Sequence, residues 1–287
     1  MRILAIYISL SLTSLAMAAE RPNFLVILVD DMGYSDPQCF GGEIDTPNLN
    51  QLADNGVRFS QFYNCARCCP TRASLLTGSY PHRVGLGRNG RTMDLNAPTI
   101  AGLLKESGYQ TAMTGKWHLS ELAATSAGQD RIGWMNHQVD LGIPFADPQS
   151  YPRQRGFDQY YGVIWGVVDF FDPFSLVHND EPVTDVADDY YLTDAITNYS
   201  VKYIEDFDKS DKDPFFLYVA YTAPHWPLHA KPEVIQKYDG QYDAGWDQLK
   251  KDRFERQRKL KLFPGSIPVE PGNSFSLRCL SKRSFLS

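Results

Sequence analysis

The chain has 287 residues, of which 43% are hydrophobic and 22% charged, a composition that excludes disordered, collagenous and coiled-coil proteins. This length suits one large α/β domain. The 28 Lys and Arg residues against 34 Asp and Glu residues give a net charge of −6, which argues against nucleic acid as a partner, because non-specific binding of that kind depends on cationic surface.

The N-terminus, residues 1–18, has the features of a secretory signal peptide. A positive start, Met1-Arg2, precedes an uncharged stretch from Ile3 to Leu15 and the small-x-small cleavage pattern Ala16-Met17-Ala18. The alternative, a buried first strand or helix, is disfavoured because Glu20-Arg21-Pro22 interrupts the chain before the next apolar run. We therefore expect an exported protein, periplasmic or secreted. We expect no membrane span after cleavage, because no later apolar run approaches ~20 residues.

The next predicted elements are a strand, a helix and a second strand. Residues 23–29 are apolar and rich in branched side chains, which predicts a parallel strand buried on both faces. Thr46 as cap and Pro47 at the first helical position start a helix that Gly56 ends. Val57 to Tyr63 predicts a short strand.

Two further helices and a strand follow. Pro70 suits the first turn of a helix that ends near Gly78. Pro98-Thr99 opens another helix over Ile100 to Glu106, and Tyr109 to Met113 predicts a strand.

The second half of the chain begins with a long irregular segment. Leu119 to Asp158 is rich in Gly, Gln and Asp with weak periodicity, which predicts a loop or insertion. Apolar residues at helical spacing predict an amphipathic helix over Tyr191 to Phe207, and Phe215 to Tyr221 predicts another buried strand. A charged helix, Asp247 to Lys261, and a Ser- and basic-rich tail complete the chain.

Strands that alternate with helices predict an α/β fold, a doubly wound, mostly parallel sheet with helices on both faces. Ligands of such sheets bind beyond the carboxyl ends of the strands. Three predicted strands end in polar clusters and a fourth cluster lies at a predicted helix start: Asp30-Asp31, Lys116 with His118, His225, and Cys68 to Arg72. Parallel strands would bring all four clusters to one edge.

The clusters at the strand ends each have a chemical interpretation and a plainer one. Asp30 and Asp31 offer hard oxygen ligands for Ca²⁺ or Mg²⁺, or they are solvated residues of a turn. Lys116 and His118, two apart on an extended segment, would face the same side and support cleavage of a charged ester. The alternatives are a loop lysine, a core histidine and, for His225, a rigid turn.

The cysteines add an anion site and a disfavoured zinc site. Five cysteines is an odd number, so at least one has no partner within the chain, even in an oxidising compartment. Cys68 at a helix start, with Arg72 a turn later, predicts an anion site; the alternative is a surface arginine beside structural cysteines. Zinc bound by Cys65, Cys68 and Cys69 is disfavoured because adjacent side chains diverge and no matching Cys or His pair follows.

The segment Cys68-Cys-Pro-Thr-Arg72 resembles the C-x-P-x-R signature of the formylglycine-dependent sulfatase family. Residues 23–33, 73–78, 114–119 and 223–225 also resemble that family, in family order. The resemblance implies an alkaline-phosphatase-like fold and an arylsulfatase-like hydrolase that cleaves sulfate monoesters of aryl or carbohydrate alcohols. It implies that Cys68 is oxidised to formylglycine by a formylglycine-generating or anaerobic maturation enzyme, giving a self-regenerating nucleophile.

The resemblance also implies the roles of the other site residues. Asp30 and Asp31, together with residue 68, would hold one Ca²⁺ ion. Arg72 would orient the hydrated aldehyde. The roles expected of the remaining polar residues are contact with the sulfate for Lys116 and His225, and handling of the diol proton for His118. One of these histidines or lysines would protonate the leaving alcohol, and Cys65 and Cys69 match no catalytic position.

The chain departs from the family pattern after the last matching segment. The family places an Asp-Asn pair of metal ligands, a second lysine and a smaller C-terminal domain later in the chain, and Asn179-Asp180 has the wrong order and position. Ca²⁺ takes ~6–8 oxygens, so weak binding is expected. We therefore expect a truncated chain, with the N-terminal part of the catalytic domain at residues 19–262 and a divergent tail at 263–287. The alternatives are a phosphodiester or phosphonate-ester hydrolase and an inactive fragment.

Overall fold

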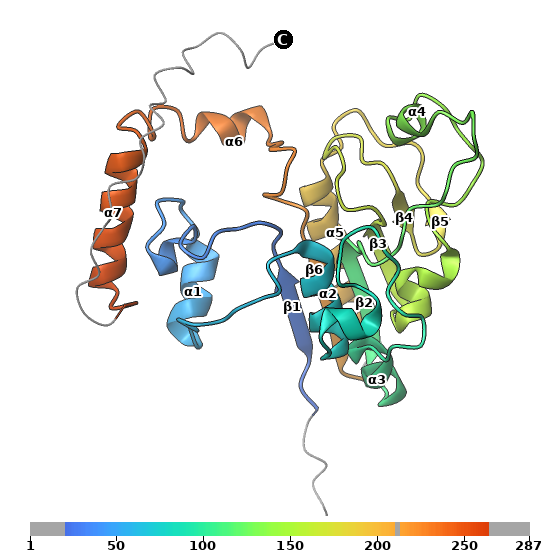
Figure 1. The fold of residues 1–287 in the computed structure, drawn as a ribbon. Coiled ribbons are helices and arrows are strands. Elements are labelled where there is room, and N and C mark those ends of the chain that lie inside the picture. The colour runs from blue at the N-terminus through green and yellow to red at the C-terminus, as the bar shows by residue number, and fades with distance from the viewer. Residues whose placement is uncertain (1–20, 210–212, 264–287) are drawn as a thin grey trace, which may run out of the picture.

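The computed structural model describes residues 21–209 and 213–263. The predicted signal peptide, almost all of the predicted tail and Cys279 lie outside these residues. Six strands form one sheet in the order β1-β6-β2-β3-β4-β5 (Figure 1). Their bounds are β1 (Phe24–Leu28), β2 (Gln110–Gly115), β3 (Gln159–Val163), β4 (Leu176–His178), β5 (Glu181–Pro182) and β6 (Phe215–Ala220).

The sheet is mostly parallel, as predicted. β1, β6, β2 and β3 run parallel, and β4 and β5 continue the sheet antiparallel. The helices α2 (Cys68–Thr77) and α3 (Ile100–Glu106) lie on one face and α5 (Leu192–Lys209) on the other (Figure 1). This placement follows from right-handed crossovers that run outward from β1 to β2 and back from β5 to β6. The predicted doubly wound fold is confirmed.

The strands in the middle of the sheet form because their side chains are apolar on both faces. In β6, the side chains from Phe216 to Ala220 are buried, as expected for a parallel strand covered on both sides. β2 continues two residues beyond the predicted Met113, because Thr114 and Gly115 keep the register with β6. The predicted helices over residues 100–106 and 191–207 are confirmed within two residues.

The prediction that the first strand is buried on both faces is wrong. Phe24, Leu25 and Ile27 of β1 are 41–49% exposed. β1 is the outermost strand of the described sheet, and β6 is its one neighbouring strand there. An apolar run predicts a strand with buried faces, but it does not show whether that strand lies in the middle or at the edge of the sheet.

The predicted strand at Val57 to Tyr63 is also wrong, because the segment is irregular and no strand pairs with it in the described sheet. The helix before it, α1 (Pro47–Asn55), has the predicted bounds, but Thr46 does not cap it. The Thr46 hydroxyl accepts a hydrogen bond from the backbone N–H of Gln38 instead. A capping threonine and a turn-stabilising threonine have the same sequence signature.

The long predicted loop contains only short helices: α4 (Arg131–Met135), η3 (Pro148–Ser150) and η4 (Pro152–Arg155). The other short helices are η1 (Gln38–Phe40), η2 (Pro81–Val84) and α6 (Pro232–Gln236). Across residues 21–209 and 213–263, no helix combines the length and the hydropathy that a bilayer span requires.

The predicted charged helix is α7 (Trp246–Lys259), which lies beside α1 and apart from the sheet (Figure 1). Its attachment is polar. The Arg253 guanidinium lies 2.6 Å from Glu43 and 2.8 Å from Asp36, and Arg256 donates to the carbonyl of Gly41. Gln257 is its one buried residue.

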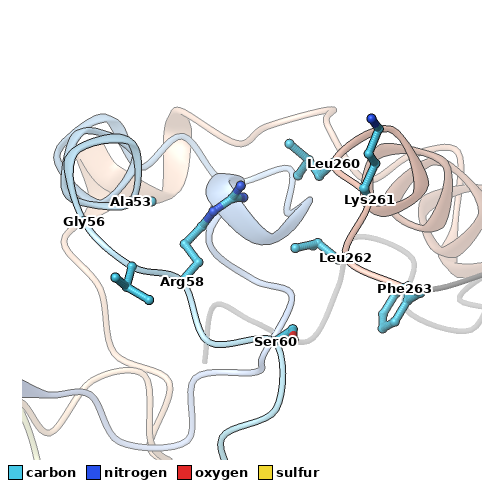
Figure 2. A pocket seen from close by; sticks show the side chains of 9 residues that line it. Ala53, Gly56, Arg58, Ser60, Leu260, Lys261, Leu262 and Phe263 are labelled. Atoms are coloured by element: carbon cyan, nitrogen blue, oxygen red, sulfur yellow. The ribbon is translucent and has the colours of Figure 1, made fainter.

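A hollow of about 850 Å³ lies between the C-terminal ends of α1 and α7 (Figure 2). Its lining includes Arg58 and Ser60 on one side and Leu260 to Phe263 on the other. None of the predicted site residues lines this hollow, so it is separate from the candidate active site.

Candidate active site

The four polar clusters meet at one edge of the sheet. β1, β6 and β2 are parallel neighbours, so the residues after them, including Asp30, His225 and Lys116, leave the sheet at the same edge. The helix α2 begins there with Cys68 as its first residue. Contacts between side chains from different clusters confirm that the clusters converge.

The centre of the site is a buried group of three charged side chains. Asp30 Oδ2 accepts a hydrogen bond from Lys116 Nζ at 2.5 Å and lies 3.4 Å from Arg72 Nη2. All three residues are at most 5% exposed. Arg72 Nη1 also donates to the Lys116 carbonyl at 2.7 Å, which fixes the guanidinium against the end of β2. Asp30 is therefore not the solvated turn residue of the plainer interpretation.

Burial changes the acid–base properties of Lys116. Desolvation and the neighbouring Arg72 guanidinium lower the pKa of Lys116, although the Asp30 carboxylate opposes the change. A lysine with a lowered pKa gives up a proton more readily near neutral pH. The buried Lys116 ammonium is therefore a stronger acid than the ammonium of an exposed lysine.

Cys68 lies in a second group with Cys69 and His118. Hydrogen bonds from Cys69 and His118 lower the pKa of Cys68, with burial opposing them, and the same contact with Cys68 raises the pKa of the Cys69 thiol. Desolvation lowers the pKa of His118. Asn89 Nδ2 lies 3.5 Å from Cys68 Sγ. Residue 68 thus has polar contacts on several sides.

The expectation that adjacent Cys68 and Cys69 diverge is wrong. Their sulfur atoms and a ring nitrogen of His118 all lie within 4.8 Å of one another. Consecutive positions in the first turn of a helix differ by about 100° rather than 180°, so a side chain from another element can meet both. Cys65 is outside this group, with its sulfur 3.6 Å from Ser74 Oγ.

Two further expectations about the backbone and the aspartates need correction. The backbone is not extended at His118, whose φ is 56°, yet His118 and Lys116 both reach the site. Asp31 differs from Asp30, since its side chain is 65% exposed and lies 3.5 Å from His225 Nε2. The adjacent aspartates therefore occupy unlike environments.

A hollow of about 390 Å³ opens at this edge. The predicted residues Asp30, Asp31, Cys68 and Arg72 line it, together with Asn64 and Thr71 of the segment before and within α2. The site thus combines cationic side chains, carboxylates and a partly buried residue 68 around one opening, which suits binding and attack on a charged ester.

The family model described as Sulfatase matches residues 22–271. The chain belongs to the sulfatase family. An arylsulfatase of Klebsiella aerogenes is 32% identical over 290 residues, covering 93% of this chain and 57% of that relative.

Two solved structures show the same fold. The complex of Ps i-CgsB with k-i-k-neocarrahexaose has a TM-score of 0.63 and 30% identity, covering 85% of this chain and 54% of that one. BT4656 in complex with D-glucosamine-2-N,6-O-disulfate has a TM-score of 0.58 and 29% identity, covering 77% and 38%. This sulfatase chain therefore spans about half the length of the relatives it matches.

Several residues around the site could not be identified from the sequence. Tyr218 lies in β6 with its hydroxyl 3.4 Å from Arg72 Nη1, and Trp165 packs edge-on against the His118 ring. Neither lies in a polar cluster, so spacing could not identify them. Asn89 lies in an irregular segment. Gly166 has no side chain and so leaves room for the His118 ring.

Gly166→Ala is expected to destabilise the protein by about 1–3 kcal/mol, as overpacking does at other buried sites. A Cβ at position 166 would lie 2.0 Å from Cε1 of His118, whose buried ring has little room to move. Urea unfolding measures the change. Gly102→Ala is the matched control, because its Cβ would meet only Thr99 Oγ1, at 3.4 Å. Equal stability of the two variants would contradict the packing role of Gly166.

Proposed function

We propose that this chain is a hydrolase of sulfate monoesters in which Cys68 acts after conversion to formylglycine. The observation that carries the proposal is the position of Cys68, the first residue of α2. It lines the hollow together with Arg72, and the buried Lys116 and His118 lie close enough to lower its pKa. Family membership supports the same chemistry. Formylglycine at this position would supply an oxygen nucleophile that is regenerated in each turnover.

The charged residues of the site would bind and polarise the sulfate. Arg72 and Lys116 are held rigidly by Asp30, so they would face developing negative charge without reorganising. His118, whose lowered pKa favours the neutral imidazole, would accept a proton at residue 68. Lys116 would donate a proton to the leaving alcohol, and His225, next to Asp31, would contact the sulfate.

The carboxylate oxygens of Asp30 and Asp31 are suitable ligands for a divalent cation, but their positions would allow only weak binding. Asp30 and Asp31 provide the hard oxygens that Ca²⁺ prefers, and both line the hollow that contains residue 68. One Asp30 oxygen is already bound by Lys116, however, and Asp31 is largely exposed. We propose that Asp30, Asp31 and residue 68 hold one Ca²⁺ ion weakly, and that the ion would polarise sulfate oxygens.

Ca²⁺ is expected to stabilise the protein only at high concentration. With a dissociation constant of about 10⁻³ M, ten times that concentration would add about 1.4 kcal/mol to the free energy of unfolding. Thermal unfolding with and without Ca²⁺ measures this effect, and Asp31→Asn is expected to remove it. Asp54→Asn, at a distant site in α1, is the control. Stabilisation that persists in Asp31→Asn would contradict the proposed ligand.

The substrate is proposed to be a sulfated aryl alcohol or glycan. The relative named arylsulfatase and the structures bound to a neocarrahexaose and a disulfated glucosamine support this class. We further propose export to the periplasm or the medium, and maturation by a formylglycine-generating or anaerobic enzyme.

The decisive experiment measures the chemical state of residue 68. The protein is isolated from its native host, and the tryptic peptide that begins at Cys68 is analysed by mass spectrometry and with a hydrazine reagent. The proposal predicts an aldehyde in that peptide and release of sulfate from an aryl sulfate faster than cleavage of an aryl phosphonate ester. An unmodified Cys68 thiol throughout the sample would refute the proposed nucleophile.

A further inference from the structure

The unmodified chain contains a group of potential metal ligands that is distinct from the carboxylates proposed to hold Ca²⁺. Among the described residues, one group of three or more Cys, His, Asp or Glu side chains places its ligand atoms within 4.8 Å of one another: Cys68, Cys69 and His118. Two sulfurs and an imidazole nitrogen are ligands that Zn²⁺ prefers, whereas Ca²⁺ prefers oxygen. The chemistry of this group therefore differs from that of Asp30 and Asp31.

The histidine of the group has a buried nitrogen with no partner. His118 is 5% exposed and its Nδ1 has no hydrogen-bond partner. Unpaired buried polar atoms are rare, because each costs the desolvation of that atom without compensation. Trp165 and Gly166 pack against the ring and limit its rotation. The ring is thus held in place beside both sulfurs.

The geometry requires only a small contraction to bind an ion. Ligand atoms around a tetrahedral Zn²⁺ lie about 3.6–3.8 Å apart, given typical Zn–S and Zn–N bond lengths. The present separations, none above 4.8 Å, exceed that by at most about 1 Å, a change that rotation of the two cysteine side chains toward the fixed His118 ring would supply. Cys68 is only partly buried, so a water molecule can reach the fourth position.

The charges around the group are compatible with Zn²⁺. Lys116 is the nearby cation that favours a Cys68 thiolate, and its own charge is paired with Asp30. Two thiolates would balance the charge of the ion, after each thiol has released its proton to solvent. The ion would then sit beside the Asp30 pair without leaving an unbalanced buried charge.

We propose that the chain with an unconverted Cys68 binds one Zn²⁺ ion through Cys68, Cys69 and His118, with water as the fourth ligand. Conversion of Cys68 to an aldehyde removes a thiolate ligand, so zinc binding and maturation exclude each other. The precursor therefore has a metal site that the mature enzyme lacks. The zinc site of the unconverted chain does not depend on sulfatase activity, whereas its loss on maturation rests on the proposed conversion of Cys68.

The test uses the full chain with Cys68 confirmed as a thiol by peptide mass. Co²⁺ reports thiolate ligation through a near-ultraviolet charge-transfer band and tetrahedral coordination through visible bands. We expect one Co²⁺ per chain, displaced by Zn²⁺ but not by Ca²⁺. Cys68→Ala and Cys69→Ala are expected to lose most of the charge-transfer band and to weaken binding at least about 100-fold. His118→Ala is expected to weaken it similarly.

Cys65→Ala is the matched control, because Cys65 lies next to the group with its sulfur against Ser74 instead. An undiminished band in Cys69→Ala, equal losses in Cys65→Ala, or displacement of Co²⁺ by Ca²⁺ would overturn the proposal. Circular dichroism verifies that each variant folds. A second measurement needs no variant: Zn²⁺ should slow alkylation of Cys68 relative to Cys39 in the wild-type chain, and equal rates would also refute the site.

Discussion

Cys68→Ala is expected to reduce sulfate release from an aryl sulfate by at least about 10⁴-fold, as loss of a covalent nucleophile does in other enzymes. Alanine cannot be converted to an aldehyde, whereas Arg72 and Lys116 keep their contacts with Asp30. Substrate binding should therefore persist while turnover is lost. Initial rates of sulfate release, compared with calorimetric binding of sulfate, separate the two effects.

The control for this prediction is Cys65→Ala, which removes a thiol three residues away that contacts Ser74. Its turnover should equal that of the wild-type protein. Comparable turnover in Cys68→Ala and wild type would refute the nucleophile. Loss of turnover together with loss of the native circular dichroism spectrum would show that the variant tests folding rather than chemistry, and Cys68→Val, which also cannot be converted to an aldehyde, then replaces it.

Asp30→Asn is expected to destabilise the protein by about 3–5 kcal/mol, because removing one partner of a buried ion pair leaves the other charges uncompensated. Lys116 and Arg72 are at most 1% exposed, and Asp30 is the carboxylate that both contact. Asp31→Asn is the matched control. Its side chain is 65% exposed and lies 3.5 Å from a single histidine, so a change within about 0.5 kcal/mol is expected.

The pH dependence of Asp30→Asn provides a second check. Without Asp30, the largest opposition to the desolvation that already lowers the pKa of Lys116 is lost. The unfolded chain then binds more protons than the folded chain between that lowered pKa and the ordinary lysine value of 10.5. Stability of the variant should rise with pH through this window. Urea unfolding at several pH values measures it, and a flat profile would contradict the buried charge.

The sequence predicted the active-site edge better than it predicted the outer parts of the fold. The apolar run at residues 215–221 can only be a strand covered on both faces, and parallel strands must end at the same edge. The strand pattern alone therefore predicts that Asp30, Lys116 and His225 lie together. The different environments of Asp30 and Asp31 were not predictable, because adjacent side chains point in different directions once φ at Asp31 becomes 64°.

Features that depend on partners distant in the sequence were missed. The apolar residues of 57–63 would form a strand only if another strand paired with them. The Thr46 hydroxyl accepts a hydrogen bond from the Gln38 backbone N–H instead of capping the helix that follows. Likewise, the convergence of Cys68 and Cys69 on His118 depends on where β2 ends. Local patterns determine the elements, whereas the positions of edges, caps and clusters depend on the assembled fold.

The ionic attachment of α7 makes the position of this helix sensitive to salt. Arg253 holds this helix to Glu43 and Asp36 through ion pairs, and only one residue of the helix is buried. Salt screens such ion pairs and therefore weakens the attachment. The apolar sheet is not weakened in this way. Raising ionic strength should therefore release α7 from its docking site while the fluorescence of Trp117, buried beside β2, stays constant.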